Sequence, residues 1–122
     1  MSAENRNAKM GEVLTKFFGT PDPTGGAMDD EIMRTAMEFC FGEVWSRPGL
    51  DHKTRSIIVI TILAAAGRSD ELRHHIGIGL TNGLTPAEIK EILLQICVYA
   101  GAPSFGHAWG IAQQVFTARG VK

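Results

Sequence analysis

Apolar residues recur along much of the chain with the period of an α-helix, and glycine and proline residues separate the periodic segments. A first helix is predicted from Ala8 to Phe18, and Gly19 ends it. The prolines and glycines of residues 21–26 predict a loop. A second helix is expected over residues 28–45, because its acidic first turn suits the positive end of the helix dipole.

The segment from His52 to Gly67 predicts a third helix, which Asp51 caps. Its β-branched middle leaves a buried strand as the alternative, but the length, the alanines and the closing glycine favour a helix. Residues 57–66 are apolar nearly all round, so this helix must be covered on every side. A chain of 122 residues has little spare surface for that cover. We therefore expect a homo-oligomer, in which another subunit supplies part of the cover.

Three more helices complete the predicted fold. Ser69 caps a fourth helix, which closes at Asn82. The fifth, Thr85 to Tyr99, opens with the strongest local signal in the chain, a capping box with proline at the first helical position. A last helix covers roughly residues 105–118. The pattern predicts an all-α protein of about six helices, with residues 1–122 in a single domain.

Composition and charge narrow the classes of function. The chain has 12 basic and 13 acidic side chains, a formal net charge of -1, and no basic cluster. We therefore expect no binding to nucleic acid or to anionic membranes. Residues 57–66 form the longest apolar stretch, too short to span a bilayer, which needs roughly 20 residues. The N-terminus is polar and lacks the apolar region of a signal peptide, which predicts a cytoplasmic protein.

The two cysteines, Cys40 and Cys97, lie far apart in the sequence, and neither belongs to a CxxC pair. A zinc site or a redox pair would need closely spaced partners. We expect two buried free thiols, and neither a metal nor an organic cofactor.

The fourth predicted helix carries the main candidates for acid–base chemistry. Glu71 and His75 are four residues apart, beside an apolar stripe formed by Leu72, Ile76 and Leu80. A carboxylate at this spacing can orient an imidazole and raise its pKa, which makes a general acid–base unit. The alternative is a solvated surface pair worth about 0.3 kcal/mol, and the spacing alone favours it.

Two glycines on the same helix favour the acid–base unit over the surface pair. Gly77 and Gly79 each destabilise a helix interior by roughly 1 kcal/mol. We interpret them as a sign that a backbone or a ligand approaches closely. The remaining histidines are interpreted as exposed or packing residues: His52, His74 and His107.

Further candidates come from other segments. Glu43, Trp45 and Arg47 lie at the end of the second predicted helix, and Arg55 lies one turn into the third. Glu43 is either buried with a raised pKa or paired with a lysine at the surface. The arginines could clamp a carboxylate, whereas tryptophan most often packs in a core or an interface. Tyr99 ends the fifth helix, where its hydroxyl could donate to a ligand.

Four segments carry a family resemblance: GEVWSRPGLD (42–51), TRSIIVITILAAAGRSDELRHH (54–75), NGLTPAEIKEILLQ (82–95) and YAGAP (99–103). In this order they resemble the 4-carboxymuconolactone decarboxylase family from about residue 38 to residue 116, while residues 1–26 match more loosely. The resemblance implies a helical fold shared with alkylhydroperoxidase D and a homo-oligomer, a hexamer or a trimer.

The resemblance also separates this chain from the peroxidase branch of that fold. The peroxidases use a CxxC motif followed four residues later by a histidine. His75 occupies the histidine place, but Arg68 and Glu71 occupy the two cysteine places. Because a peroxide needs a thiolate to attack it, this departure argues against thiol peroxidase activity.

The resemblance implies decarboxylation of 4-carboxymuconolactone to 3-oxoadipate enol-lactone in the breakdown of aromatic compounds. Carbon dioxide leaves from the carbon that bears the ring oxygen, and the electron pair passes through the ring double bond to the lactone carbonyl. The substrate supplies its own electron acceptor, so the reaction requires no cofactor. The protein must stabilise charge on the carbonyl oxygen and protonate the α-carbon. His75, oriented by Glu71, is the hypothetical proton donor, and Glu43 is the second candidate acid.

The remaining candidates would bind a small anionic substrate. Arg47 and Arg55 would hold the carbonyl oxygen or the remote acetate group, because an arginine on the departing carboxylate would stabilise the ground state. Trp45 and Tyr99 would line the pocket. Two other functions stay open: an isomerase, hydrolase or decarboxylase for another carbonyl acid or lactone, and a non-catalytic helical assembly that binds a small ligand.

Overall fold

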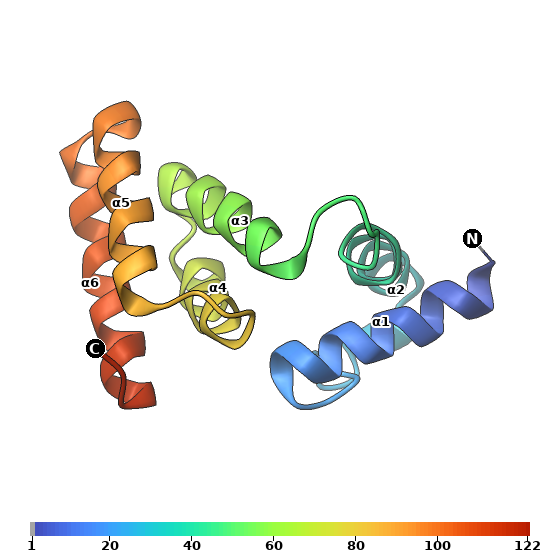
Figure 1. Ribbon diagram of the computed structural model, residues 1–122. Coiled ribbons are helices and arrows are strands. Elements are labelled where there is room, and N and C mark those ends of the chain that lie inside the picture. The colour runs from blue at the N-terminus through green and yellow to red at the C-terminus, as the bar shows by residue number, and fades with distance from the viewer. Residues whose placement is uncertain (1) are drawn as a thin grey trace. The chain divides into compact units, whose positions relative to one another are not determined.

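The computed structural model describes residues 2–122, and no strand occurs among them (Figure 1). The described helices are α1 (Ala3–Phe18), η1 (Ala27–Asp29), α2 (Glu31–Met37), η2 (Glu38–Val44), α3 (His52–Ala66), α4 (Ser69–Thr81), α5 (Pro86–Ala100) and α6 (Ala102–Arg119). The predicted all-α class is confirmed, and the strand alternative for α3 is wrong. None of the described helices is both long and apolar enough to cross a membrane.

The chain forms two compact units, one ending at Asp51 and one running from His52 to Lys122. Each unit is described by itself. The predicted single domain over residues 1–122 stays a prediction.

In the first unit, α1 begins earlier than predicted. Ser2 is the N-cap residue, and its hydroxyl oxygen accepts a hydrogen bond from the backbone N–H of Asn5 at 3.1 Å. The helix therefore starts at Ala3 rather than Ala8, because the cap stabilises a polar first turn that has no apolar period. Gly19 ends the helix as predicted, with a φ of 78° that favours glycine.

The predicted second helix, residues 28–45, is divided into η1, α2 and η2. Asp30 caps α2, since its carboxylate accepts hydrogen bonds from the N–H groups of Ile32 and Met33 at 2.9 and 3.1 Å. The following η2 is a π-helix, in which the chain winds more widely than in an α-helix. The prediction of one continuous helix was wrong because the polar cap restarts the hydrogen bonding at Asp30.

Helix α1 packs against η2 within this unit (Figure 1). The closest approach is at Gly42, where a Cβ atom would lie 2.3 Å from the backbone oxygen of Arg6. The ring of Phe17 meets the edges of two neighbouring aromatic rings, Trp45 at 4.9 Å and Phe41 at 6.3 Å between centroids. The contact therefore combines a missing side chain with edge-to-face aromatic packing.

In the second unit, α5 and α6 lie side by side, and α3 packs against α4, α5 and α6 (Figure 1). These helices share one apolar core, whose largest fully buried members are Ile60, Leu72, Ile76, Ile89 and Leu93. The packing leaves α3 partly uncovered, so that Ile58 and Ile62 are 44% and 59% exposed.

The helix ends of this unit follow local chemistry. The capping box of α5 is confirmed, with both bonds between Thr85 and Glu88 at 3.0 Å. The predicted cap of α4 is wrong: Arg68 holds the N-cap position, and the hydroxyl of Ser69 instead lies 2.6 Å from Nε2 of His107 on α6. Helix α6 starts at Ala102, earlier than predicted, because a proline fits in the first turn of a helix.

The two cysteines are free thiols, but they are half-buried rather than buried as predicted. Burial raises the pKa of Cys40. Because the thiolate is the reactive form of cysteine, this environment keeps Cys40 unreactive.

Candidate active site

Helix α4 carries the histidine on which the sequence interpretation rests. The predicted apolar stripe is confirmed, with Leu72 and Ile76 fully buried and Leu80 packed against the core. His75 lies beside this stripe and is half-buried. It shares a helix face with Gly79, one turn later, where α4 meets α3. The fold therefore holds the imidazole near the contact between α3 and α4.

The environment of His75 differs from the expectation. Burial lowers the pKa of His75 from 6.5 to about 4, and the neighbouring charge of His74 lowers it as well. Glu71 raises the pKa, but by less than burial lowers it. Glu71 thus acts in the predicted direction, but the net shift is downward, because Glu71 is exposed to solvent, which screens its charge, while burial penalises the imidazolium directly. The imidazole is therefore neutral at pH 7.

Arg55 lies on the first turn of α3 and is half-buried. The next residue, Ser56, is fully buried, and its hydroxyl oxygen accepts a hydrogen bond from Nδ2 of Asn82 at 2.9 Å. This bond aligns the start of α3 with the end of α4. His75 precedes Asn82 by seven residues, which is roughly 10 Å along the helix axis. Arg55 and His75 therefore lie on two helices that this bond holds together.

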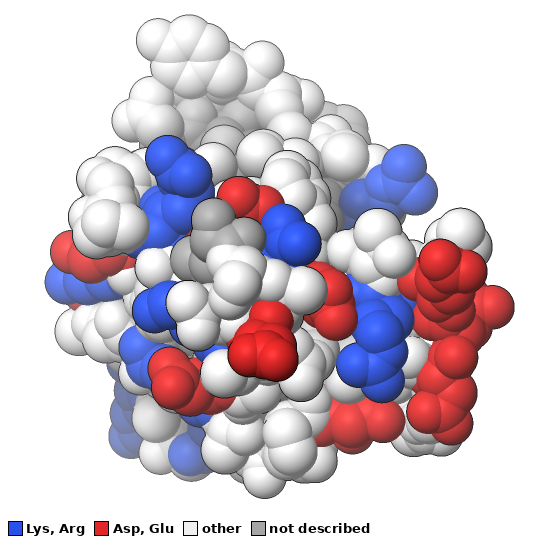
Figure 2. All heavy atoms as spheres, turned by 90° about the vertical axis from the view of Figure 1, so that its right-hand side faces the viewer, with Lys and Arg blue, Asp and Glu red and all other residues white. Residues whose placement is uncertain are grey.

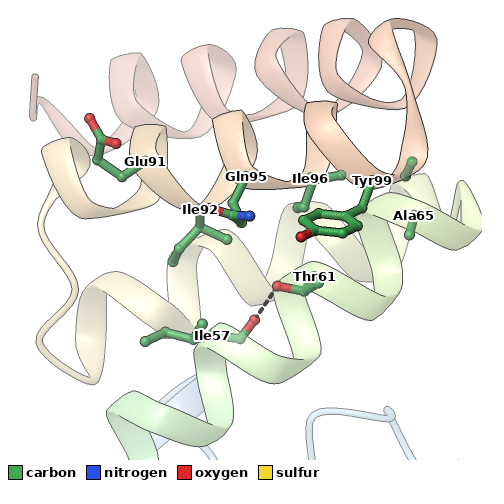
Figure 3. Close-up of a pocket in the computed structure, with 9 residues that line it drawn as sticks. Ile57, Thr61, Ala65, Glu91, Ile92, Gln95, Ile96 and Tyr99 are labelled. Carbon is green, nitrogen blue, oxygen red and sulfur yellow. Dashed lines mark hydrogen bonds between the residues drawn. The ribbon is translucent and has the colours of Figure 1, made fainter.

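Tyr99 lies in a separate groove between α3 and α5 (Figure 3). The groove encloses about 580 Å³ and is lined by Ile57, Thr61, Ala65, Glu91, Ile92, Gln95, Ile96, Tyr99 and Ala100. Its walls are mostly apolar, and the Thr61 hydroxyl donates to the carbonyl oxygen of Ile57 at 2.8 Å, within its own helix. The ring of Tyr99 is 85% exposed. His75 and Arg55 do not line this groove, so the structure does not join Tyr99 to them.

The first unit holds the other three candidates. Glu43 is half-buried and forms an ion pair with Arg6 at 3.7 Å, so its partner is an arginine rather than the expected lysine. Trp45 is 5% exposed and packs against Phe17, in line with the packing interpretation. Arg47 is exposed. The proposed chemical roles of these residues stay predictions.

The protein atoms nearest to the two glycines of α4 belong to side chains and not to a backbone. A Cβ atom on Gly79 would lie 3.0 Å from Cδ1 of Leu84 and 3.1 Å from Cδ1 of Ile60. A Cβ atom on Gly77 would lie 2.8 Å from Nη2 of Arg119. The sequence could not identify these neighbours, because Arg119 is 42 residues away in the chain.

Sequence reasoning also missed the buried pair of Ser56 and Asn82. The available signal was a serine inside an otherwise apolar segment of α3, since a buried hydroxyl needs a partner. The other histidines lie elsewhere on the surface: His74 is exposed, His52 is half-buried rather than exposed, and His107 is exposed rather than packed, with Nε2 2.6 Å from the hydroxyl of Ser69.

Charge is mixed over the protein surface seen in Figure 2, where basic and acidic side chains are interspersed. In the part of the chain that the structure describes, no three histidine, cysteine, aspartate or glutamate side chains are grouped so as to hold a metal ion.

Comparison with known proteins adds to this geometry. The sequence model of the carboxymuconolactone decarboxylase family matches residues 30–114. The chain is 47% identical to 4-carboxymuconolactone decarboxylase of Acinetobacter baylyi, covering 99% of this chain and 94% of that protein. It is 38% identical to nitrosuccinic acid decarboxylase of Metarhizium robertsii, over 63% of this chain and 54% of that protein. It is 35% identical to an uncharacterized 15.0 kDa protein of Paracoccus denitrificans, over 66% of this chain and 61% of that protein.

Proposed function

The chain belongs to the carboxymuconolactone decarboxylase family, and from this premise we propose that it converts 4-carboxymuconolactone to 3-oxoadipate enol-lactone in aromatic catabolism. The observation that carries the proposal is the 47% identity to the Acinetobacter baylyi 4-carboxymuconolactone decarboxylase over 99% of this chain and 94% of that protein. The family match extends across Asp51, which supports a single functional domain over residues 1–122.

The chemistry of two named relatives supports a common principle. In 4-carboxymuconolactone the carboxylate leaves from a carbon conjugated, through the ring double bond, to the lactone carbonyl. In nitrosuccinic acid, named for the Metarhizium robertsii relative, a nitro group can take the electron pair. Both substrates supply their own electron acceptor. We therefore expect the protein to contribute binding, charge stabilisation and a proton.

His75 is the proposed proton donor, although burial keeps its imidazole neutral at pH 7. An anionic group within about 4–6 Å raises a histidine pKa by roughly 1–3 units. The substrate brings two carboxylates, and further negative charge develops on the lactone carbonyl oxygen as carbon dioxide leaves. Substrate binding would therefore favour the imidazolium, which donates its proton to the α-carbon of the dienolate. Glu71 would orient the ring, and Glu43 is the second candidate acid.

The proposed binding residues follow from the same charge pattern. Arg55 would hold the carbonyl oxygen or the remote acetate group of the substrate. The bond between Ser56 and Asn82 supports this role, because it aligns the turn of α3 that carries Arg55 with the end of α4. Arg47, Trp45 and Tyr99 stay proposed substrate-binding residues. The departing carboxylate should stay free of arginine, because its charge is lost in the transition state.

The test is turnover of 4-carboxymuconolactone by the purified protein. We expect loss of the lactone and release of one carbon dioxide per molecule, and in D₂O one deuterium at the α-carbon of the product. Heat-denatured protein and His75→Ala serve as controls. Absence of turnover with the lactone would reject this substrate.

The nitrosuccinic acid decarboxylase relative favours a second candidate, decarboxylation of a nitro acid. The same assay with nitrosuccinate distinguishes the two substrates, because each consumes a different acid. Binding of either acid without carbon dioxide release would support the non-catalytic alternative.

We also propose that the protein is a cytoplasmic homo-oligomer, a hexamer or a trimer, with the alkylhydroperoxidase D-like fold that the resemblance implies. Support comes from apolar side chains left open on α3 and α5, where Ile62 is 59% and Val98 is 73% exposed. A second copy would remove this surface from water, which is favourable by roughly 25 cal/mol per Å².

A further inference from the structure

A second groove is formed by α4 and α6. It encloses about 330 Å³ and is lined by Arg73, Gly77, Gln114, Val115, Ala118 and Arg119. Neither aspartate nor glutamate is among these lining residues. Arg73 and Gly77 are one turn apart and share a face of α4, whereas His75 points to roughly the opposite face. This groove is therefore distinct from the candidate active site.

Each guanidinium group of the groove donates a hydrogen bond to a neutral side chain. Nη2 of Arg73 donates to Oε1 of Gln114 at 2.9 Å, and Nη1 of Arg119 donates to the hydroxyl oxygen of Thr81 at 3.3 Å. Asp70 approaches Arg73 to 3.8 Å, but its side chain is 94% exposed and so compensates the charge weakly. Within residues 2–122, no carboxylate forms an ion pair with Arg119. The groove thus keeps a strongly positive lining.

Helix α4 carries a destabilising glycine, Gly77, where the guanidinium of Arg119 lies against it. Glycine inside a helix is less favourable than alanine by roughly 1 kcal/mol. At Gly77 a Cβ atom would lie only 2.8 Å from Nη2 and 3.3 Å from Cζ of Arg119. The missing side chain is what lets the guanidinium of Arg119 lie against α4.

We propose that this groove binds a small dianion, inorganic phosphate or a short dicarboxylate. Arginine side chains recognise carboxylate and phosphate oxygens through paired N–H donors. Arg73 and Arg119 line the same groove, and the guanidinium of Arg119 lies against α4 at Gly77, one turn after Arg73, so both cations face the same space. Val115 and Ala118 add apolar surface for a short carbon chain, and the volume is at the lower end for small-molecule sites. The site does not depend on the proposed decarboxylation.

Isothermal titration calorimetry at constant ionic strength tests the proposal without any lactone present. The probes are phosphate, succinate and acetate. We expect saturable binding of a dianion, at least tenfold tighter than that of acetate, and the comparison of phosphate with succinate identifies the preferred source. Arg119→Gln and Arg73→Gln should each weaken binding tenfold or more.

Gly77→Ala is the sharpest variant, because it keeps both arginines and adds a residue that favours helix. Its Cβ atom should displace the Arg119 guanidinium and weaken dianion binding about tenfold, while the protein stays folded. Gly106→Ala on α6, where a Cβ atom meets nothing within 4 Å, is the matched control and should bind normally. Equal heats of binding in all variants would mean an adventitious ion only and would overturn the proposal. The proposal would also be overturned if His75→Gln abolished dianion binding and Arg119→Gln did not.

Discussion

Asn82 at the end of α4 donates a hydrogen bond from Nδ2 to the hydroxyl oxygen of Ser56 on α3, at 2.9 Å. Ser56 is fully buried, so this bond fixes the start of one helix against the end of the other. A polar group is tolerated in such a contact because it is paired.

Removal of the Ser56 hydroxyl should destabilise the protein. Ser56→Ala leaves the amide of Asn82 without this acceptor, and we expect the free energy of unfolding in urea to fall by about 1–2 kcal/mol. Thr61→Ala is the control, since Thr61 is exposed and its hydroxyl bonds within its own helix. The control should change stability by no more than about 0.5 kcal/mol. Equal effects in the two variants would contradict a stabilising role for this contact.

The close contact of α1 with η2 should not accept a side chain at Gly42. In Gly42→Ala the new Cβ atom would lie 2.3 Å from the backbone oxygen of Arg6, so backbone atoms must move. We expect a loss of about 3 kcal/mol in urea unfolding. Gly106→Ala, in open space on α6, should instead stabilise by up to about 1 kcal/mol. If Gly42→Ala were as stable as the wild type, the close contact would be wrong.

His75 should make stability depend on pH. Its pKa is about 4 in the folded chain and 6.5 when unperturbed, so the unfolded chain binds the extra proton first as the pH falls. Above pH 6.5 the imidazole is neutral in both states, and between pH 6.5 and 4 the free energy of unfolding falls by up to about 3 kcal/mol as the unfolded chain takes up the proton. In unfolding measured from pH 7.5 to 4, the wild type should therefore lose stability relative to His75→Leu on acidification. A constant difference would contradict the buried neutral imidazole.

The proposed proton transfer predicts a graded loss of activity. His75→Ala should lower kcat for the lactone by roughly 100-fold, and Glu71→Gln should lower it less, because glutamine keeps a hydrogen-bonding partner. The kcat of the wild type should fall as pH rises through the pKa of His75 in the substrate complex, since the imidazolium is the donor. His107→Gln, at an exposed histidine, is the control. Wild-type activity in all three variants would remove the pair of Glu71 and His75 from the mechanism.

The uncovered face of α3 predicts association. A charge at Ile62, as in Ile62→Glu, should shift the protein to smaller species in sedimentation velocity at micromolar concentration, because burying an unpaired carboxylate is unfavourable. Thr117→Glu, at an exposed position of α6, should leave the assembly unchanged. Monomeric wild-type protein would remove the proposed oligomer.

Several elements could be predicted because their signals are local. The cap at Thr85 needs only Glu88 three residues later, and both bonds form as expected. The stripe that contains Leu72 and Ile76 follows from helical spacing, and it is buried. The division near Asp30 was missed because the hydrophobic pattern runs through it, whereas the cap depends on the orientation of one carboxylate.

The candidate site could be predicted only as a set of residue types. Glu71 and His75 were paired from their spacing, but the pKa of His75 depends on how many apolar atoms surround the ring. Tyr99 was assigned to a pocket, and it does line a groove, yet with Gln95 and Thr61 rather than with His75.

The sequence by itself determined the helices, most of their ends, the buried stripe of α4 and the family to which the chain belongs, because these depend on residues near one another or on order along the chain. The tertiary structure decided that burial keeps His75 neutral, that Ser56 meets Asn82, and that Gly77 makes room for Arg119. Desolvation and close packing depend on atoms brought together from distant parts of the chain, and no local pattern encodes them.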